Sequence, residues 1–342
     1  MSGAPGVALP LAGRVELLEV ESEALRGNPA GEPHRRQVPV YLPPGAEDGP
    51  GLPCLFLLAS FTGHARGFLE THPWRPGPVL QYDRAVAAGE APPAILLMPE
   101  CWTRLGGSQY VNSSYLGRFE DHVAGELVEL ADARYPVLPG RRGVLGKSSG
   151  GFGALHLGMR HARRFPVVGS ISGDCSFEYC FGGEILAALR GLVPHGMDPA
   201  RFLAAFAEDP DLAGDGHAVL NVLAMSACYS PDPASPLGFQ LPMDLETGAR
   251  IESVWSRWLD FDPVVAARRH ADELRRLELL HLECGLRDEF HLQWGLRLLV
   301  RVLDELGVAY EHEEHEGGHR GIGHRTAPLL AKLAGALAQS PR

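Results

Sequence analysis

The chain has 342 residues, of which 45% are hydrophobic and 21% are charged, and its formal net charge is −11. These values are ordinary for a globular enzyme with a full core. The acidic balance argues against nucleic acid or an anionic membrane surface as the main partner. No segment approaches the roughly 20 apolar residues that a membrane span needs.

The first residues, MSGAPGVALPLAG, lack the basic start and the long apolar core of a secretion signal. The six cysteines are widely spaced and contain no C-x-x-C pair, which favours buried free thiols over disulfides. We therefore expect a cytoplasmic protein with no cofactor and no metal. Composition leaves self-association into a homo-oligomer open.

Strand-like and helix-like segments alternate along most of the chain. The segments 14–21 and 36–42 alternate apolar and polar residues, whereas 52–60 and 94–100 are continuous apolar runs. Apolar residues at helical spacing follow at 120–135. The remaining expected strands lie at 142–146, 166–173, 278–285 and 309–316, and the remaining expected helices at 151–165, 270–277, 291–307 and 326–339. This alternation predicts an α/β fold with a doubly wound, mostly parallel sheet and helices on both faces.

The alternation stops between 176 and 262. That stretch holds helical pieces at 184–192 and 199–207 and loops rich in Pro and Gly, such as YSPDPASPLGFQLP. We interpret residues 1–342 as a single domain and 176–262 as a cap-like insertion within it.

The stretch GRRGVLGKSSGGFGALHLG, at 140–158, carries two competing signals. A phosphate-binding loop requires G-x-x-x-x-G-K-S/T, but the position of its first glycine is occupied by Arg141. A nucleophile elbow requires G-x-S-x-G between a strand and a helix, with small residues where the two approach closely. Gly146, Ser148 and Gly150 meet that pattern, and a predicted strand and helix flank them. We therefore predict Ser148 as a catalytic nucleophile.

A serine nucleophile needs a base, and in this kind of fold the order along the chain is Ser, then an acid, then His. Asp288 follows the strand that ends near Cys284, with Glu289 as the alternative acid. His319 lies on a glycine-rich loop after the next strand. We predict His319 as the general base and Asp288 as the group that orients it. The rival histidines are His312, His315 and His324; HEEHEGGH does not have the spacing of a helical zinc motif.

The oxyanion of an acyl-transfer intermediate needs two N–H donors. Ser149, at the start of the helix, is the first candidate, because the helix dipole also favours negative charge there. The second should come from the loop ASFTGHARG after the 52–60 strand, where Phe61 is the choice and Thr62 the alternative.

The loop 101–114 follows another strand and is rich in polar and aromatic side chains. Loops at the carboxyl ends of strands line the pockets of such sheets. Substrate contacts are therefore predicted for Trp102, Arg104, Gln109, Tyr110 and Asn112.

The motif GKSSGGFGAL and the strand–loop FLLASFTG resemble the "Putative esterase" family of α/β-hydrolases. That family includes S-formylglutathione hydrolases (esterase D), feruloyl and enterochelin-type esterases, and mycolyltransferases. The resemblance covers about residues 35–175 and 263–335 and implies an α/β-hydrolase fold with a Ser–Asp–His triad. Ser60 departs from the pattern, because many members have glycine there.

The function that these signals favour is a serine carboxylic-ester hydrolase that acts on a small ester through an acyl-enzyme on Ser148. The alternative is an acyltransferase with the same triad, in which an alcohol or thiol accepts the acyl group. A binding module without catalysis would be expected to lack a triad member, and no member is missing.

Overall fold

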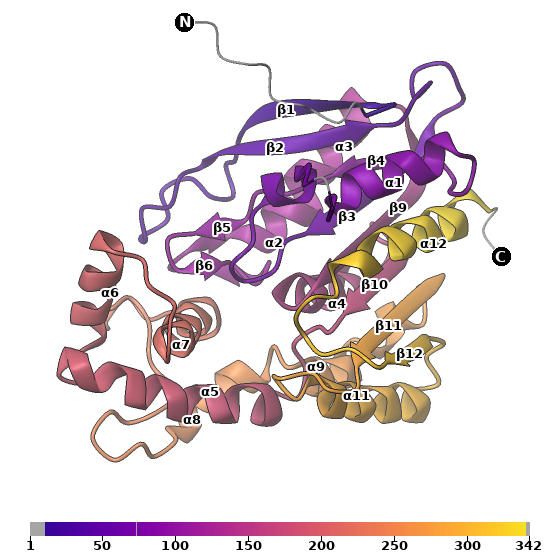
Figure 1. Ribbon diagram of the computed structural model, residues 1–342. Coiled ribbons are helices and arrows are strands. Elements are labelled where there is room, and N and C mark those ends of the chain that lie inside the picture. Colours follow the sequence, from indigo (N-terminus) through magenta and orange to yellow (C-terminus); the bar gives the residue numbers. More distant parts are fainter. Residues whose placement is uncertain (1–10, 73, 340–342) are drawn as a thin grey trace, which may run out of the picture.

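The computed structural model describes residues 11–72 and 74–339, so most of the N-terminal stretch examined for a secretion signal lies outside it. Eight strands form one sheet in the order β1-β2-β4-β3-β9-β10-β11-β12 (Figure 1). They are β1 (Arg14–Glu21), β2 (Arg35–Leu42), β3 (Leu52–Leu58), β4 (Ile95–Leu97), β9 (Val137–Lys147), β10 (Val167–Ile171), β11 (Leu279–Gly285) and β12 (Glu311–His315). β1, β2 and β4 pair antiparallel, and the pairs from β4 to β12 are parallel. The expected mostly parallel sheet is confirmed.

Strand β3 shows why the sheet is covered on both faces. Cys54, Phe56 and Leu58 belong to one buried cluster, whereas Leu55 and Leu57 belong to the other. Successive side chains of a strand point to opposite faces, so a continuous apolar run feeds two cores. The first core contains α3 (Leu127–Arg134), α4 (Ser149–His161) and α11 (Leu292–Leu306), and the second contains α1 (Pro78–Ala87) and α12 (Thr326–Ala338).

Between β10 and β11 the described elements are all helical. They are α5 (Phe177–Leu192), η3 (Val193–His195), α6 (Pro199–Glu208), α7 (Gly216–Tyr229), α8 (Glu252–Leu259), α9 (Pro263–Arg269) and α10 (Ala271–Leu274). In Figure 1, α5, α6, α7 and α8 gather at the lower left, beyond one end of the sheet. We call residues 177–259 the helical segment. The expected pieces at 184–192 and 199–207 fall within α5 and α6, whereas α7 has no counterpart in the sequence prediction.

The other elements are short. The loop after β4 forms two hairpins, β5 (Trp102–Thr103) with β6 (Gly106–Gly107) and β7 (Asn112–Ser113) with β8 (Gly117–Arg118). The helix expected at 120–135 is built from α2 (Phe119–Asp121), the π-helical turn η2 (His122–Glu126) and α3; η1 (Ala65–Leu69) and η4 (Gly323–Arg325) are single turns. All six cysteines are free and buried, as expected. Within the described chain, no helix is long and apolar enough to cross a membrane.

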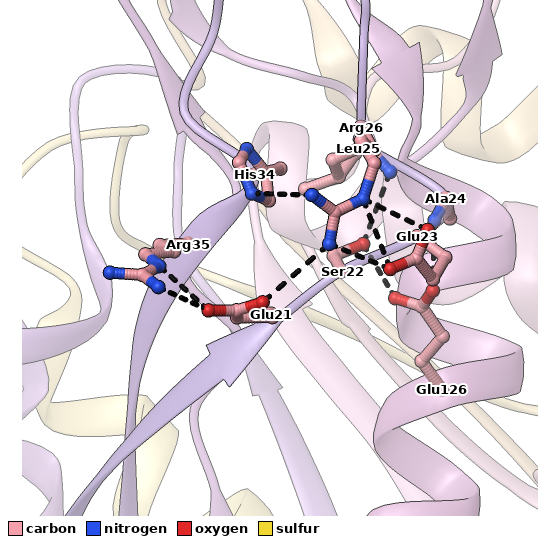
Figure 2. Close-up of polar contacts among 9 residues, drawn as sticks. All are labelled: Glu21, Ser22, Glu23, Ala24, Leu25, Arg26, His34, Arg35 and Glu126. Carbon is pink, nitrogen blue, oxygen red and sulfur yellow. Dashed lines mark hydrogen bonds and ion pairs between the residues drawn. The ribbon is translucent and has the colours of Figure 1, made fainter.

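One half-buried carboxylate ties the edge of the sheet to η2. Glu126 accepts hydrogen bonds from the Ser22 hydroxyl and, at 2.8 Å, from the Ala24 N–H, just after β1 (Figure 2). Its other contact is the His122 ring, 2.8 Å away. Burial opposes ionisation of Glu126, but these hydrogen bonds outweigh it and lower its pKa to about 2. The residues that follow β1 are thereby held against η2.

Candidate active site

Ser148 lies on a sharp turn between β9 and α4. Its backbone has φ 57° and ψ −127°, a region that L-residues rarely occupy and that costs on the order of 1–3 kcal/mol. A Cβ at Gly146 would lie 2.4 Å from the Gly150 carbonyl carbon, and one at Gly150 would lie 2.2 Å from the Leu58 carbonyl oxygen. Both glycines are therefore required by the close approach of strand and helix, which holds the Ser148 hydroxyl at the end of the sheet.

The three residues expected to act together do meet in space. His319 Nε2 lies 3.0 Å from Ser148 Oγ, and His319 Nδ1 lies 2.8 Å from Asp288 Oδ2. Asp288 and His319 are only 3% and 6% exposed. Asp288 Oδ1 also accepts the Phe290 N–H at 3.0 Å. Burial favours the neutral acid, but the hydrogen bond and charge of His319 outweigh it, so the pKa of Asp288 lies below its usual value.

Neighbouring parallel strands deliver the acid and the histidine to the same edge. Asp288 follows β11, and His319 follows β12, which pairs with β11. A Cβ at Gly285 would lie 2.5 Å from the Gly317 carbonyl oxygen, so the histidine loop crosses β11 where there is no side chain. The Phe290 ring packs edge-on against His319, with centroids 4.8 Å apart. These contacts fix the orientation of the imidazole.

Glu289, the alternative acid, has a different contact from Asp288. Its carboxylate accepts a hydrogen bond from the backbone N–H of His319, and Asp288 alone of the two meets the imidazole. That backbone hydrogen bond lowers the pKa of Glu289 despite some burial. Glu289 therefore holds the loop that carries His319.

Ser149 and Phe61, the two expected oxyanion donors, line the same cavity as Ser148. Ser149 is the first residue of α4, where N–H groups have no intrahelical acceptor. The Phe61 carbonyl accepts the Gly107 N–H at 2.7 Å, and among the described residues none accepts a hydrogen bond from the Phe61 N–H. The Ser60 hydroxyl donates to the Lys147 carbonyl at 3.0 Å. Ser60 thus links the loop after β3 to the turn that carries Ser148.

A cavity of about 760 Å³ opens over Ser148. Its sheet side includes Phe61, Thr62, Ser149 and His319. The helical segment forms much of the opposite wall through Phe181 and Glu184 of α5 and His217, Ala218 and Asn221 of α7.

Two charged groups of the cavity stand out. Asp174 follows β10, and Lys147 precedes the serine. Burial lowers the pKa of Lys147, although the nearby carboxylates of Asp288 and Asp174 oppose the shift. Neither was singled out from the sequence as a site residue. The rule that identified Asp288, an acid just past the end of a strand, applies equally to Asp174 and could have found it.

The five residues predicted to contact substrate are placed elsewhere. Among the described residues that line this cavity, none belongs to that set. Three of them make hydrogen bonds away from the cavity. The Trp102 carbonyl accepts a hydrogen bond from Arg36, the Arg104 N–H donates to Glu32, and the Asn112 side chain donates to Asp121. The loop forms two hairpins that pack against the rest of the chain, so its polar groups make hydrogen bonds within this structure and not with the cavity.

Gln109 and Tyr110 are instead buried beside the cavity and hydrogen-bond to residues at or next to its lining. Gln109 is fully buried, and its Nε2 donates to Asp174 Oδ2 at 3.1 Å. The Tyr110 hydroxyl donates to the Ala59 carbonyl at 2.7 Å, directly before the loop of Phe61. Both have positive φ, 55° and 57°, so this turn is held in an unusual conformation. Their side chains position residues of the cavity and do not line it.

A cluster with metal-ligand chemistry lies away from the serine. One ligand atom each of His281, Glu283 and Glu313 falls within 4.8 Å of the others. Arg325 forms ion pairs with both carboxylates. Since Arg325 bridges the two carboxylates, the cluster is explained as a structural ion network.

The chain is similar to known esterases. The model of the "Putative esterase" family matches residues 32–319. A mouse S-formylglutathione hydrolase is 28% identical over 156 residues, which are 42% of this chain and 54% of that protein, so the chain spans about half the length of this relative.

Solved structures extend the likeness across the fold. A ferulic acid esterase superposes with a TM-score of 0.59 at 19% identity, over 96% of this chain and 100% of that one. An S-formylglutathione hydrolase from Agrobacterium tumefaciens also gives 0.59, at 15% identity over 96% and 98%. These neighbours are α/β-hydrolases, so the expected α/β-hydrolase fold is confirmed.

Proposed function

The chain belongs to the "Putative esterase" family, and from that premise we propose that it hydrolyses small carboxylic esters through an acyl-enzyme on Ser148. Family membership supports carboxylic-ester hydrolysis, and the triad and the acyl-enzyme make the proposal specific. The observation that carries it is the chain of contacts from Ser148 Oγ to His319 at 3.0 Å and from His319 to Asp288 at 2.8 Å.

In the proposed mechanism, His319 takes the proton of Ser148 as Oγ attacks the ester carbonyl carbon. The N–H groups of Phe61 and Ser149 stabilise the oxyanion. Collapse of the tetrahedral intermediate breaks the bond to the alcohol, which leaves with the proton from His319. Water then attacks the acyl-enzyme by the same route and releases the acid. Asp288 stays ionised and holds the imidazole in the correct tautomer.

The proposal includes residues 176–262 as a cap-like insertion in a single domain, because α5 and α7 contribute Phe181, Glu184 and His217 to the cavity. It also includes a cytoplasmic location, which the six free thiols support. Water is the proposed acyl acceptor because the relatives are named hydrolase and esterase. Assays with added alcohols and thiols test this: free acid should remain the main product, and a dominant new ester or thioester would identify an acyltransferase.

The test of the mechanism is turnover of chromogenic acyl esters of rising chain length by the native enzyme, Ser148→Ala and the surface control Ser256→Ala. We expect burst kinetics on good substrates and a loss of roughly 10³-fold or more in kcat for Ser148→Ala. Ser256→Ala should match the native enzyme. Native-like turnover by Ser148→Ala would refute the proposed nucleophile.

A further inference from the structure

Asp174 occupies a rigid turn at the boundary between the sheet and the helical segment. It follows β10 and precedes α5. Asp262 accepts the next backbone N–H groups, those of Ser176 at 2.9 Å and Phe177 at 2.7 Å. On the other side, a Cβ at Gly295 would lie 2.2 Å from the Cys175 carbonyl oxygen, so α11 packs directly on this turn. The backbone that presents Asp174 to the cavity is therefore fixed.

Only one carboxylate oxygen of Asp174 has a partner. Oδ2 accepts from Gln109 Nε2 at 3.1 Å, and the same nitrogen lies 3.1 Å from the Tyr229 hydroxyl. Within the described chain, Oδ1 accepts no hydrogen bond and the carboxylate forms no ion pair. Burial raises the pKa of Asp174 to about 6, although Gln109, His319 and Lys147 act in the opposite direction. At neutral pH the group is thus mostly an anion with an unused acceptor.

Glu184, which also lines the cavity, has a basic neighbour. Glu184 Oε2 accepts from Asn221 Nδ2 at 3.2 Å and lies 3.6 Å from the His217 ring. His217 in turn packs edge-on against Phe61, with centroids 5.7 Å apart. These side chains stabilise the wall by binding one another. Asp174 contrasts with them, because its partly buried carboxylate forms no ion pair within the described chain and keeps one oxygen free to accept a donor in the cavity.

We propose that Asp174 determines specificity by accepting a hydrogen bond from a donor group, a hydroxyl or an ammonium, of the ester substrate. Asp174 lines the same cavity as Ser148 and His319, so the donor belongs to the part of the substrate held beside the scissile ester. The preferred substrates are therefore hydroxy or amino esters, and purely alkyl esters are turned over less well. This inference rests on the proposed esterase function and adds the chemical class of its substrate.

The test compares kcat/KM for matched esters. On the acyl side, p-nitrophenyl esters of straight-chain acids carry methyl, hydroxyl or ammonium at successive carbons. On the alcohol side, propyl acetate is compared with 2-hydroxyethyl acetate and 2-(dimethylamino)ethyl acetate. Because a hydrogen bond to a charged group is worth about 1.5–3 kcal/mol, the native enzyme should favour the best-placed donor by about 10-fold or more. Absence of preference at every position would refute the proposal.

Asp174→Asn keeps an acceptor for Gln109 but turns a donor toward the cavity. The ratio of kcat/KM between donor-bearing and methyl esters should fall toward one. If Asp174→Asn folds poorly, Asp174→Ser provides the same test and should show the same fall. Asp209→Asn, on the exposed turn after α6 and outside the cavity lining, is the matched control, and it should keep the native ratio. An unchanged ratio in both Asp174 variants overturns the proposal, and so does an equal drop of the ratio in Asp209→Asn.

The ratio separates recognition from a structural role, since a damaged fold lowers both esters together. Labelling of Ser148 by a fluorophosphonate in Asp174→Asn separates this inference from the proposed function. If Ser148 is labelled in Asp174→Asn and the preference for donor-bearing esters is lost, both the inference and the proposed function are supported. If Ser148→Ala turns over every ester at the native rate, the esterase mechanism fails first. If an ammonium group raises kcat/KM more than a hydroxyl does, and added salt weakens this gain, the substrate is cationic. If the two groups raise kcat/KM equally, the donor is neutral.

Discussion

The rim of the sheet and the helical segment contribute to the same cavity in different ways. At the rim, Ser148, Asp288 and His319 are held by strand ends, by glycines that allow close approach and by hydrogen bonds to backbone. In the helical segment, Glu184 and His217 are held by contacts between side chains of α5, α7 and the rim. The sheet therefore fixes the residues of the proposed triad, whereas the helical segment shapes the cavity beside them.

The largest expected effect separates the two neighbouring acids of the rim. Asp288→Asn should lower kcat about 10⁴-fold, because an amide stabilises the wrong tautomer of the base. Glu289→Gln should lower kcat less than about 10-fold, since its amide oxygen can still accept the His319 N–H and only the charge is lost. Steady-state kinetics on one chromogenic ester measures both. The reverse order of effects would assign the acid to Glu289.

A pair of glycines contrasts the packing of the two regions. Gly150→Ala should destabilise the protein by about 3 kcal/mol or more, because its Cβ would lie 2.2 Å from the Leu58 carbonyl oxygen. Gly183→Ala, on α5 with no atom within 4 Å of the added Cβ, should stabilise it by about 0.5–1 kcal/mol. Urea unfolding measures both. A native-like stability of Gly150→Ala would show that the elbow is less tightly packed than described.

The smallest expected effect concerns Glu126 at the sheet edge. Its folded pKa of about 2 lies below the ordinary value of 4.5, so its stabilising effect is full above pH 4.5 and is lost as the pH falls toward 2. Glu126→Gln should therefore lower the free energy of unfolding by about 2 kcal/mol at pH 7 and by less at pH 3. The exposed neighbour Glu129→Gln should change it by less than about 0.5 kcal/mol at either pH. A pH-independent effect of Glu126→Gln would contradict the assigned shift.

The difference between the regions also explains what the sequence could predict. The sheet residues carry local signals: apolar runs mark strands, and G-x-S-x-G between a strand and a helix marks an elbow. The predicted meeting of Ser148, Asp288 and His319 needed only the rule that parallel strands end at one edge. Helix α7 gave no such signal, because nearly all of its residues are buried and it lacks an apolar stripe.

The residues of α5 and α7 that line the cavity could not be predicted from the sequence for the same reason. Which polar side chains face Ser148 depends on how α5 and α7 pack against the rim, and that is set by non-local contacts. Substrate contacts were predicted for the loop 101–114 from its position and its polar and aromatic composition. Its polar groups instead make hydrogen bonds within and around two hairpins, and Gln109 contacts the cavity only through Asp174. The rule that acids past strand ends face the site also predicts Asp174, which follows β10.

The central claim is that the hydroxyl of Ser148 is activated by His319 for attack on an ester carbonyl. Its most direct test is to treat the native protein and Asp288→Asn with a fluorophosphonate and to map the labelled peptide by mass spectrometry. We expect a single phosphonylated residue, Ser148, formed rapidly in the native protein and roughly 10³-fold or more slowly in the variant. A label on any other residue, or equal labelling rates in the two proteins, would contradict the claim.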